Sequence, residues 1–227
     1  MRFRRHERST ASGSFRIFLL AFLLALLSVP AYLVDGEISR FATRALSNPI
    51  VAGFIDASSD IGIVLLLLIF GGLATSLWTR ERRWNWLPAM LGGAVVLAYL
   101  TSEVIKLIVE ELRPCQKLDL PLVAACPPLG DWSWPSNHSV IAGALAAACV
   151  IIRRSVSLLV SSLAVIVGVG RVFAGEHYAH DVLAGLALGV LVVGAAWALY
   201  RTIAPHMGWG ASALPGSDPD AGMNPGV

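Results

Sequence analysis

The sequence predicts an all-α protein, a bundle of six transmembrane helices built as one membrane domain. Hydrophobic residues make up 56% of the 227 residues and charged residues only 14%, whereas a water-soluble domain carries about 25% charged residues. The apolar residues gather in six long stretches, and the basic residues lie mostly at their ends. The net charge of +2 is too small to suggest nucleic-acid binding.

Crossing the hydrocarbon core of a bilayer as a helix takes about 20 mostly apolar residues. Six stretches reach or approach this length, although the fourth is short unless its helix begins before His138. Gly185 and Gly189 form a GxxxG motif, which we interpret as close helix packing in lipid rather than a dimer contact. The expected helices cover about 15–33, 61–78, 87–109, 139–152, 156–173 and 181–200.

The segments outside these helices have distinct compositions. Residues 1–14 are basic and resemble the start of a secretory signal, but the following stretch is long for a signal, so we expect a retained anchor. The membrane domain then covers 15–203. Residues 204–227 are rich in Gly and Pro and are expected to be disordered. Apolar residues at helical spacing between Asp35 and Asn48 predict a short helix on the membrane surface.

The distribution of basic residues predicts the orientation. Cytoplasmic loops carry an excess of Lys and Arg. Eleven of the 17 basic residues fall on the side that holds the N-terminus and the gaps near Arg80 and Arg153, and six fall on the other side. We therefore expect both termini in the cytoplasm, and the loops after the third and fifth spans outside.

The first of three polar clusters is Lys106-x6-Arg113-Pro114, at the end of the third span. Seven residues are close to two helical turns, so the two cations would share one face. Pro114 disfavours helical backbone at Arg113 and is expected to end the helix. Such a pair suits an anionic head group, although Lys and Arg also reach the interface without any binding role.

The second cluster is Trp134-Pro135-Ser136-Asn137-His138, at the start of the fourth span. Ser136 is placed to be the N-cap, and free amides at a helix N-terminus bind phosphate. His138 in the first turn could protonate a leaving group. An ordinary capped helix with an incidental histidine would give the same pattern.

The third cluster runs from Arg171 to Asp181, at the outer end of the last two spans. His177 and Asp181 are four residues apart and would meet on one helical turn. A carboxylate on one imidazole nitrogen makes the other nitrogen a better nucleophile, and Arg171 offers a fork for phosphoryl oxygens. Glu176 and His180 have the same spacing and remain an alternative pair.

Together the clusters resemble the signature of the type 2 phosphatidic acid phosphatase (PAP2) family, K-x6-R-P, P-S-(G/N)-H and S-R-x5-H-x3-D, between Lys106 and Asp181. Asn137 stands where glycine is commoner, and Gly170 stands where serine is usual. The resemblance implies the fold shared by this family and the haloperoxidases, with the site at the outer end of the helical bundle.

The resemblance also implies a metal-independent mechanism without a cofactor. His177 would attack phosphorus to form a phosphohistidine, Asp181 would orient it, and His138 would protonate the leaving oxygen and then activate water. The phosphoryl oxygens would be held by Lys106, Arg113, Arg171, Ser136 and Asn137.

The implied substrate is a membrane lipid phosphate exposed on the outer face of a bacterial plasma membrane. Polyprenyl diphosphate or monophosphate is favoured, with phosphatidate or phosphatidylglycerophosphate as alternatives. The same residues would serve a lipid phosphotransferase. The apolar spans argue against a soluble vanadium haloperoxidase, and charges gathered at one edge argue against a transporter or scaffold. The sequence does not predict the oligomeric state.

The three cysteines differ in their surroundings. Cys149 lies in an apolar stretch and is expected to pack. Cys115 and Cys126 share the polar loop predicted to lie outside, where thiols can oxidise. We hypothesise that these two form a disulfide, which would limit how far Arg113 and Ser136 drift apart.

Overall fold

The computed structural model describes residues 2–45, 49–81, 86–118, 120 and 126–204. Every regular element in these ranges is a helix, which confirms the all-α prediction. The tail expected to be disordered lies outside the described residues from position 205 onward. The elements are α1 (Arg2–Leu33), α2 (Asp35–Ala45), α3 (Pro49–Glu81), α4 (Leu87–Val109), α5 (Pro114–Lys117), α6 (Asn137–Ile152), η1 (Arg154–Val156), α7 (Ser157–Phe173) and α8 (Ala179–Ile203).

Five helical stretches are long and apolar enough to cross a membrane, and they lie in α1, α3, α4, α8 and in α7 together with η1. The sixth, α6, begins before His138 but has only 16 residues, which at 1.5 Å per residue spans roughly 24 Å. The helix at 87–109 has the expected bounds, whereas α1 and α3 extend well beyond the expected 15–33 and 61–78. The count of six spans is therefore approximate.

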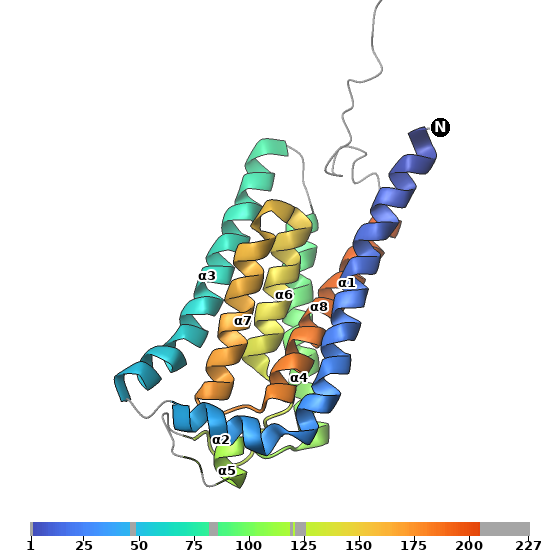
Figure 1. Ribbon diagram of the computed structural model, residues 1–227. Coiled ribbons are helices and arrows are strands. Elements are labelled where there is room, and N and C mark those ends of the chain that lie inside the picture. The colour runs from blue at the N-terminus through green and yellow to red at the C-terminus, as the bar shows by residue number, and fades with distance from the viewer. Residues whose placement is uncertain (1, 46–48, 82–85, 119, 121–125, 205–227) are drawn as a thin grey trace, which may run out of the picture.

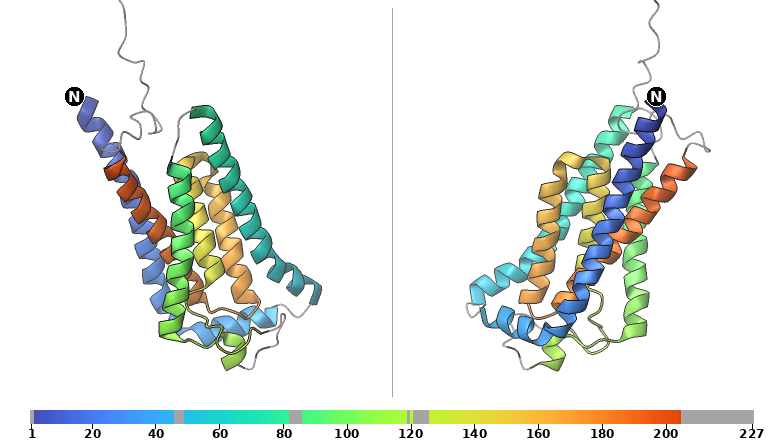
Figure 2. Two further views of the ribbon diagram at one scale, coloured as in Figure 1. Left: turned by 180° about the vertical axis from the view of Figure 1, so that it is seen from behind. Right: turned by 45° about the vertical axis from the view of Figure 1, so that its right-hand side comes forward.

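The helix α6 lies at the centre of the bundle and packs against α3, α4, α7 and α8 (Figure 1). Both views in Figure 2 show α1 running along α8 at one side of the bundle. Burial by four neighbours explains why α6 is rich in Ala, because its side chains meet other helices instead of lipid.

Two glycines of α8 bring it against α6. A methyl group on Gly185 would lie 2.6 Å from the Ser136 carbonyl oxygen, and one on Gly189 would collide with the Val140 carbonyl oxygen. On the facing helix, a methyl group on Gly143 would lie 2.7 Å from the Leu186 carbonyl oxygen. The GxxxG motif is therefore used for helix packing within this chain, as predicted.

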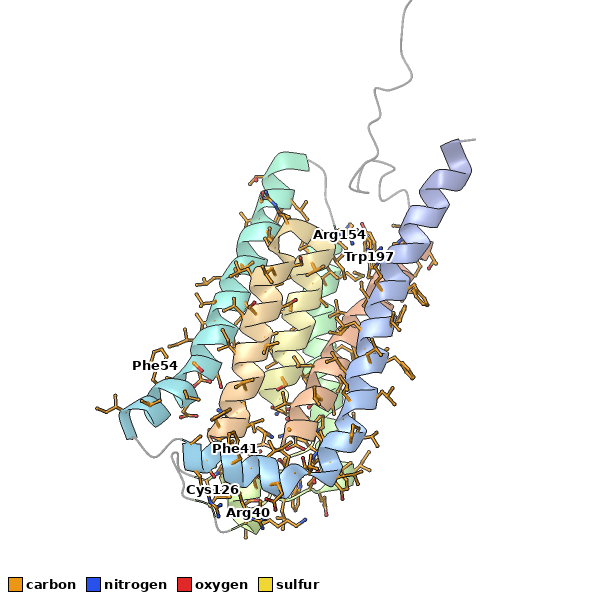
Figure 3. The ribbon with its side chains drawn as sticks, viewed as in Figure 1. Arg40, Phe41, Phe54, Cys126, Arg154 and Trp197 are labelled. Carbon is orange, nitrogen blue, oxygen red and sulfur yellow. A yellow bond between two sulfur atoms is a disulfide. The ribbon has the colours of Figure 1, made fainter. Side chains whose placement is uncertain are left out.

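Large apolar side chains cover the outside of the bundle, including Phe22, Leu68 and Ile108. This inverted exposure is expected where lipid replaces water around the spans. Figure 3 shows Arg154 towards one end of the bundle and Cys126 towards the other. The N-terminus lies at the Arg154 end of the bundle (Figure 1). The side predicted to be rich in basic residues and the side predicted to be poor in them therefore correspond to opposite ends of the bundle.

The short helix α2 lies across the end of the bundle opposite the N-terminus (Figure 1), where it contacts α7 and α8. Its buried side chains are Asp35, Ser39, Ala42 and Thr43, and Phe41 is 71% exposed. The helix expected on the membrane surface is thus present, but its inner face is more polar than its apolar periodicity suggested.

Candidate active site

The three sequence clusters meet at the end of the bundle covered by α2. The C-terminal ends of α4 and α7 and the N-terminal ends of α6 and α8 all reach this end, so the loops between them share it. Lys106, Arg113, Ser136, Arg171, His177 and Asp181 are all buried there. Burial of so many polar groups is costly unless each finds a partner, so their contacts define the site.

His177 lies in the turn between α7 and α8 and is 1% exposed. Its Nδ1 is 3.4 Å from Asp181 Oδ2 and 3.3 Å from Ser133 Oγ. Asp181 Oδ2 also accepts hydrogen bonds from Ser133 Oγ at 2.5 Å and from the Tyr178 amide at 2.8 Å. These donors fix one carboxylate oxygen beside the imidazole.

The other imidazole nitrogen faces a cation. Arg113 NH1 lies 3.1 Å from His177 Nε2, and a guanidinium group can only donate hydrogen bonds. The arrangement therefore requires a lone pair on Nε2 and the proton on Nδ1, towards Asp181. Burial, together with the charges of Arg113 and Arg171, holds the pKa of His177 well below its usual value of 6.5. The imidazole is neutral at physiological pH, and Nε2 carries the lone pair that a nucleophile needs, with Arg113 NH1 as its partner.

Lys106 and Arg113 both reach Asp131, although not from one continuous helix. The helix α4 ends at Val109, and Glu110 has left-handed backbone with φ 51°, so the expected two-turn spacing is not what brings them together. Arg113 NH2 is 2.8 Å from Asp131 Oδ1, and Lys106 Nζ is 3.7 Å from the same oxygen. Partial burial alone would raise the pKa of Asp131, but the hydrogen bond and charge of Arg113, with the charge of Lys106, lower it.

Arg171 forms ion pairs with Glu176 and with Asp56 of α3, the latter at 3.6 Å. Its Nε is buried without a hydrogen-bond partner in the described part of the chain. Glu176 also lies 3.6 Å from Arg113 NH1, so one carboxylate links the two arginines. An unbonded guanidinium N–H is a donor that a phosphoryl oxygen could satisfy.

Ser136 occupies the N-cap position of α6, as predicted, but its hydroxyl makes no capping hydrogen bond. The Ser136 amide donates to the Asp181 carbonyl oxygen at 3.2 Å, so this amide is already engaged and is less suited to phosphate than the sequence suggested. The Ser136 hydroxyl is buried and, among the described residues, has no partner. That hydroxyl is the group of Ser136 that fits a phosphate-binding role.

The side chain of Asn137 is held by α4. Its amide nitrogen donates to Glu103 Oε1 at 2.5 Å, and its carbonyl oxygen accepts from Ser102 Oγ at 2.7 Å. The residue that stands in place of the commoner glycine thus joins the N-terminus of α6 to α4. Its side chain is turned towards α4, so its backbone amide is the group better placed for a ligand at the start of α6.

His138 is the most exposed of the predicted site histidines, and its Nε2 lies 3.0 Å from Asp60 Oδ1 of α3. This carboxylate was not predicted, because α3 contributes to none of the three clusters. Asp60 and Asp56 are four residues apart and reach His138 and Arg171 respectively. Burial and the charge of Arg171 lower the pKa of His138, and Asp60 opposes this shift, favouring the protonated form that a general acid needs.

Gly170 allows α3 to approach α7. A methyl group on Gly170 would collide with Ser59 Oγ and lie 3.0 Å from the Ile55 carbonyl oxygen. Ser59 is fully buried and donates to the Val167 carbonyl oxygen at 3.1 Å. The space that a serine side chain at position 170 would need is therefore filled by Ser59, which explains this departure from the family pattern.

Glu176 and His180 do not pair with each other among the described contacts, so the alternative to the His177–Asp181 pair is not formed. Glu176 joins the arginines, and His180 lies among Asp35, Glu111 and Asp181. Glu111, His180 and Asp181 each place one ligand atom within 4.8 Å of the others, a set that could hold a metal ion. The contacts present are those of ion pairs.

Cys115 and Cys126 are joined by a disulfide with a Cα–Cα distance of 5.9 Å. The Cys115 amide donates to the Gly175 carbonyl oxygen at 3.1 Å. Gly175, with φ +75°, is two residues before His177, so the bridged loop is attached directly to the turn that presents the imidazole. The third cysteine, Cys149, is buried and unbridged.

Several residues of the site were missed in the sequence. Ser133, Asp131 and Asp60 contact His177, Arg113 and His138 respectively. Asp131 and Ser133 lie just before the second cluster, and their closeness to Trp134-Pro135-Ser136 was the available signal. Asp60 gives no such signal, since only the packing of α3 against α6 and α7 brings it to the site.

The sequence is similar to those of known proteins. The model of the PAP2 superfamily matches residues 87–204, just over half of the chain. A lipid A 1-phosphatase from Rhizobium etli is 30% identical over 163 residues, which are 68% of this chain and 70% of that protein. An undecaprenyl-diphosphatase from Sulfolobus acidocaldarius is 32% identical over 95 residues, which are 41% of this chain and 46% of that protein.

A solved structure shares the fold. The crystal structure of a transmembrane PAP2-type phosphatidylglycerolphosphate phosphatase from Bacillus subtilis superposes with a TM-score of 0.60 at 22% identity, over 84% of this chain and 96% of that chain. The region matched by the family model contains all three clusters and the helices that position them. The chain belongs to the PAP2 superfamily and is a multi-pass membrane phosphatase of that family.

Proposed function

We propose that this enzyme hydrolyses a phosphomonoester or diphosphate of a membrane lipid through a phosphohistidine formed on His177. The observation that carries the proposal is the environment of this imidazole. Its Nδ1 faces Asp181, its Nε2 faces Arg113, and the buried ring is kept neutral. A neutral imidazole with a fixed tautomer, set among cations, is what attack on a phosphoryl group requires.

In the first step His177 Nε2 bonds to phosphorus and the bond from phosphorus to the lipid oxygen breaks. His138 gives its proton to that oxygen. In the second step His138 takes a proton from water, the water oxygen attacks phosphorus, and the bond to Nε2 breaks to release phosphate. Lys106, Arg113 and Arg171 stabilise the charge on the phosphoryl oxygens in both transition states, which is the main requirement of phosphoryl transfer.

We propose that the site faces away from the cytoplasm. Two features support this orientation. The basic residues that are predicted to be cytoplasmic gather at the end of the bundle that holds the N-terminus and Arg154. The site lies at the opposite end. Cys115, whose amide bonds to Gly175 two residues before His177, forms a disulfide with Cys126, and disulfides persist in oxidising compartments.

Thiol labelling tests the orientation and the disulfide together. Denatured protein without reductant should label only at Cys149, and reductant should expose Cys115 and Cys126. In intact cells treated with reductant, a reagent that cannot cross the membrane should then reach Cys115 and Cys126. Labelling of both without reductant shows that the bridge is absent, and protection from the impermeant reagent after reduction places the loop in the cytoplasm.

Within the class of lipid phosphates we favour polyprenyl diphosphate or monophosphate, which are carrier lipids recycled at the outer face of a bacterial plasma membrane. The undecaprenyl-diphosphatase from Sulfolobus acidocaldarius supports this choice. A second candidate is the 1-phosphate of lipid A, favoured by the match to the Rhizobium etli enzyme over a longer part of the chain. Phosphatidylglycerophosphate and phosphatidate complete the panel to be tested.

Phosphate release by the purified protein in mixed micelles tests the proposal. The panel is polyprenyl diphosphate, polyprenyl monophosphate, lipid A, phosphatidylglycerophosphate and phosphatidate, each with and without a chelator, and with vanadate as a phosphate mimic. We expect turnover that survives the chelator and is inhibited by vanadate, with the highest kcat/KM on a polyprenyl substrate. Release only after addition of an acceptor lipid would identify a phosphotransferase, and recovery of chelated enzyme by a divalent ion would contradict the metal-independent mechanism.

A further inference from the structure

His180 is a buried histidine that the proposed mechanism does not use. It is 4% exposed and lies one residue before Asp181 in the first turn of α8. Its Nδ1 is 2.5 Å from Asp35 Oδ2, and its Nε2 is 3.1 Å from both Glu111 Oε2 and Asp181 Oδ1. The three carboxylates come from three parts of the chain: the start of α2, the segment after α4, and α8.

The charges in this cluster indicate the state of the imidazole. A neutral imidazole has one N–H, so one of its nitrogens would present a lone pair to a carboxylate oxygen at contact distance. Doubly protonated His180 has N–H groups on both sides and partly neutralises the buried carboxylates. Two aromatic rings also contact the His180 ring. The Tyr178 ring is stacked on it with 5.6 Å between the ring centroids, and the Tyr32 ring meets it edge-on with 5.0 Å between the centroids. The cluster is therefore best balanced with His180 as a cation.

The two oxygens of Asp181 have different partners. Oδ2 faces His177 and accepts from Ser133 and the Tyr178 amide. Oδ1 is buried, has no hydrogen-bond donor among the described residues, and has His180 Nε2 at 3.1 Å. The Ser133 and Tyr178 donors therefore hold Oδ2, and the charge of His180 holds Oδ1, so that His180 adds to the interactions that oppose rotation of this carboxylate.

We propose that His180 is a positioning residue for the phosphatase reaction: held by Asp35 and Glu111, it fixes the Asp181 carboxylate that orients His177. The same contacts attach the short helix α2, which lies across the site end of the bundle, to the catalytic turn (Figure 1). This inference rests on the proposed function, because it assigns His180 a role only through Asp181 and His177.

The first test compares kcat and KM of His180→Ala with those of wild type on a lipid phosphate that the enzyme hydrolyses. A displacement on the order of 1 Å at a catalytic group can lower the rate about a hundredfold, so we expect kcat to fall about ten- to hundredfold. We expect KM to change by less than about threefold, because an interaction made only in the transition state affects kcat and not ground-state binding. A kcat within about twofold of wild type overturns the proposal.

A matched pair of variants in α2 tests the anchoring of His180. Asp35→Asn removes a charge that contacts His180, and we expect kcat to fall about three- to tenfold. Glu37→Gln removes a charge two residues further along the same helix. Glu37 is 81% exposed, and its ion pair is with Arg40 of α2 itself, so this control should retain wild-type kcat. Equal effects of the two variants overturn the anchoring role.

A double-mutant cycle tests whether His180 acts through Asp181. Asp181→Asn should abolish most of the effect of His180→Ala on kcat, since the group that His180 holds is already altered. If the two losses multiply, His180 acts independently of Asp181 and the proposal is wrong. Where Asp181→Asn is too slow to measure, the ¹⁵N spectrum of the His177 imidazole replaces the cycle.

The ¹⁵N measurement needs no turnover. Wild type should show His177 protonated at Nδ1 alone, and His180→Ala should show a mixture of tautomers. An unchanged tautomer, or a divalent metal ion that copurifies with wild type and is lost from His180→Ala, overturns the positioning role. Retained turnover in His177→Ala would instead show that the proposed function has failed, whereas an inactive His177→Ala beside a fully active His180→Ala removes this inference alone.

Discussion

The end of the bundle that carries His177 and the shaft formed by α6 and α8 are held together in different ways. At the end, helices are joined by ion pairs, such as Arg171 of α7 with Asp56 of α3 and His180 of α8 with Asp35 of α2. In the shaft, the backbones of α6 and α8 meet directly at Gly143, Gly185 and Gly189. Changes of charge without change of shape should therefore affect chemistry at the end, whereas one added methyl group should affect folding in the shaft.

The largest effect is expected from the nucleophile. His177→Ala removes the atom that would bond to phosphorus, and loss of a nucleophile lowers kcat on the order of 10⁵-fold or more. Asp181→Asn keeps the shape but reverses the tautomer preference, with an expected loss of roughly 10³- to 10⁴-fold. Steady-state kinetics on a hydrolysed lipid phosphate measure both. Activity of His177→Ala near wild type would remove the nucleophile assignment.

A smaller loss is expected at His138. His138→Ala removes the proposed general acid, which contributes about 10²- to 10⁴-fold. Because the lipid monophosphate released from a diphosphate leaves more readily than an alkoxide, the loss should be least for polyprenyl diphosphate and greatest for a phosphomonoester. The ratio of kcat/KM values on the two substrates measures this dependence. Equal losses on both would argue against His138 as the acid.

The shaft offers a matched pair of glycines. Gly189→Ala should lower the free energy of unfolding by about 1–3 kcal/mol, since overpacking a close helix contact forces the helices apart. Gly93→Ala in α4 makes the same change where a methyl group meets no atom within 4 Å, so it should be neutral or stabilise by up to about 1 kcal/mol. Thermal unfolding in detergent compares them, and equal effects would show that the α6–α8 contact does not depend on Gly189.

The smallest effect is a dependence of stability on pH. The pKa of His177 is held below 6.5 by burial and by neighbouring cations, so below pH 6.5 the unfolded chain binds a proton that the native protein excludes. The free energy of unfolding should therefore fall as pH drops from about 6.5, by up to about 1.4 kcal/mol per pH unit. His177→Asn should have a shallower slope over pH 5–7. An identical slope in both proteins would place the pKa of native His177 near its ordinary value.

The sequence predicted the helices of the shaft better than the contacts at the end of the bundle that carries His177. Apolar length and small residues were enough to place α4 within its observed bounds and to interpret Gly185 and Gly189 as a packing motif. These features are local in the chain. The early start of α1 at Arg2 was missed, because a basic segment gives no apolar signal although it can continue a helix.

At the site end, the sequence predicted the cations, the histidines and Asp181, but not the other carboxylates that contact them. Asp60 and Asp56 reach the site only because α3 packs against α6 and α7. Likewise, Asp35 reaches His180 only because the chain turns sharply between α1 and α2. Contacts between residues far apart in sequence depend on the packing angles of helices, which hydrophobic periodicity does not determine.

The central claim is that His177 Nε2 carries the phosphoryl group during turnover. The most direct measurement is rapid quenching in alkali with a ³²P-labelled lipid substrate, followed by proteolysis and identification of the labelled peptide. We predict a label that is stable in alkali and lost in acid, on the peptide that contains His177. It should be absent from His177→Ala. With a diphosphate substrate, whose leaving group needs the acid least, it should be more abundant in His138→Ala, where water is activated poorly. Full turnover with no labelled protein at any quench time, or a label on another residue, would contradict this account.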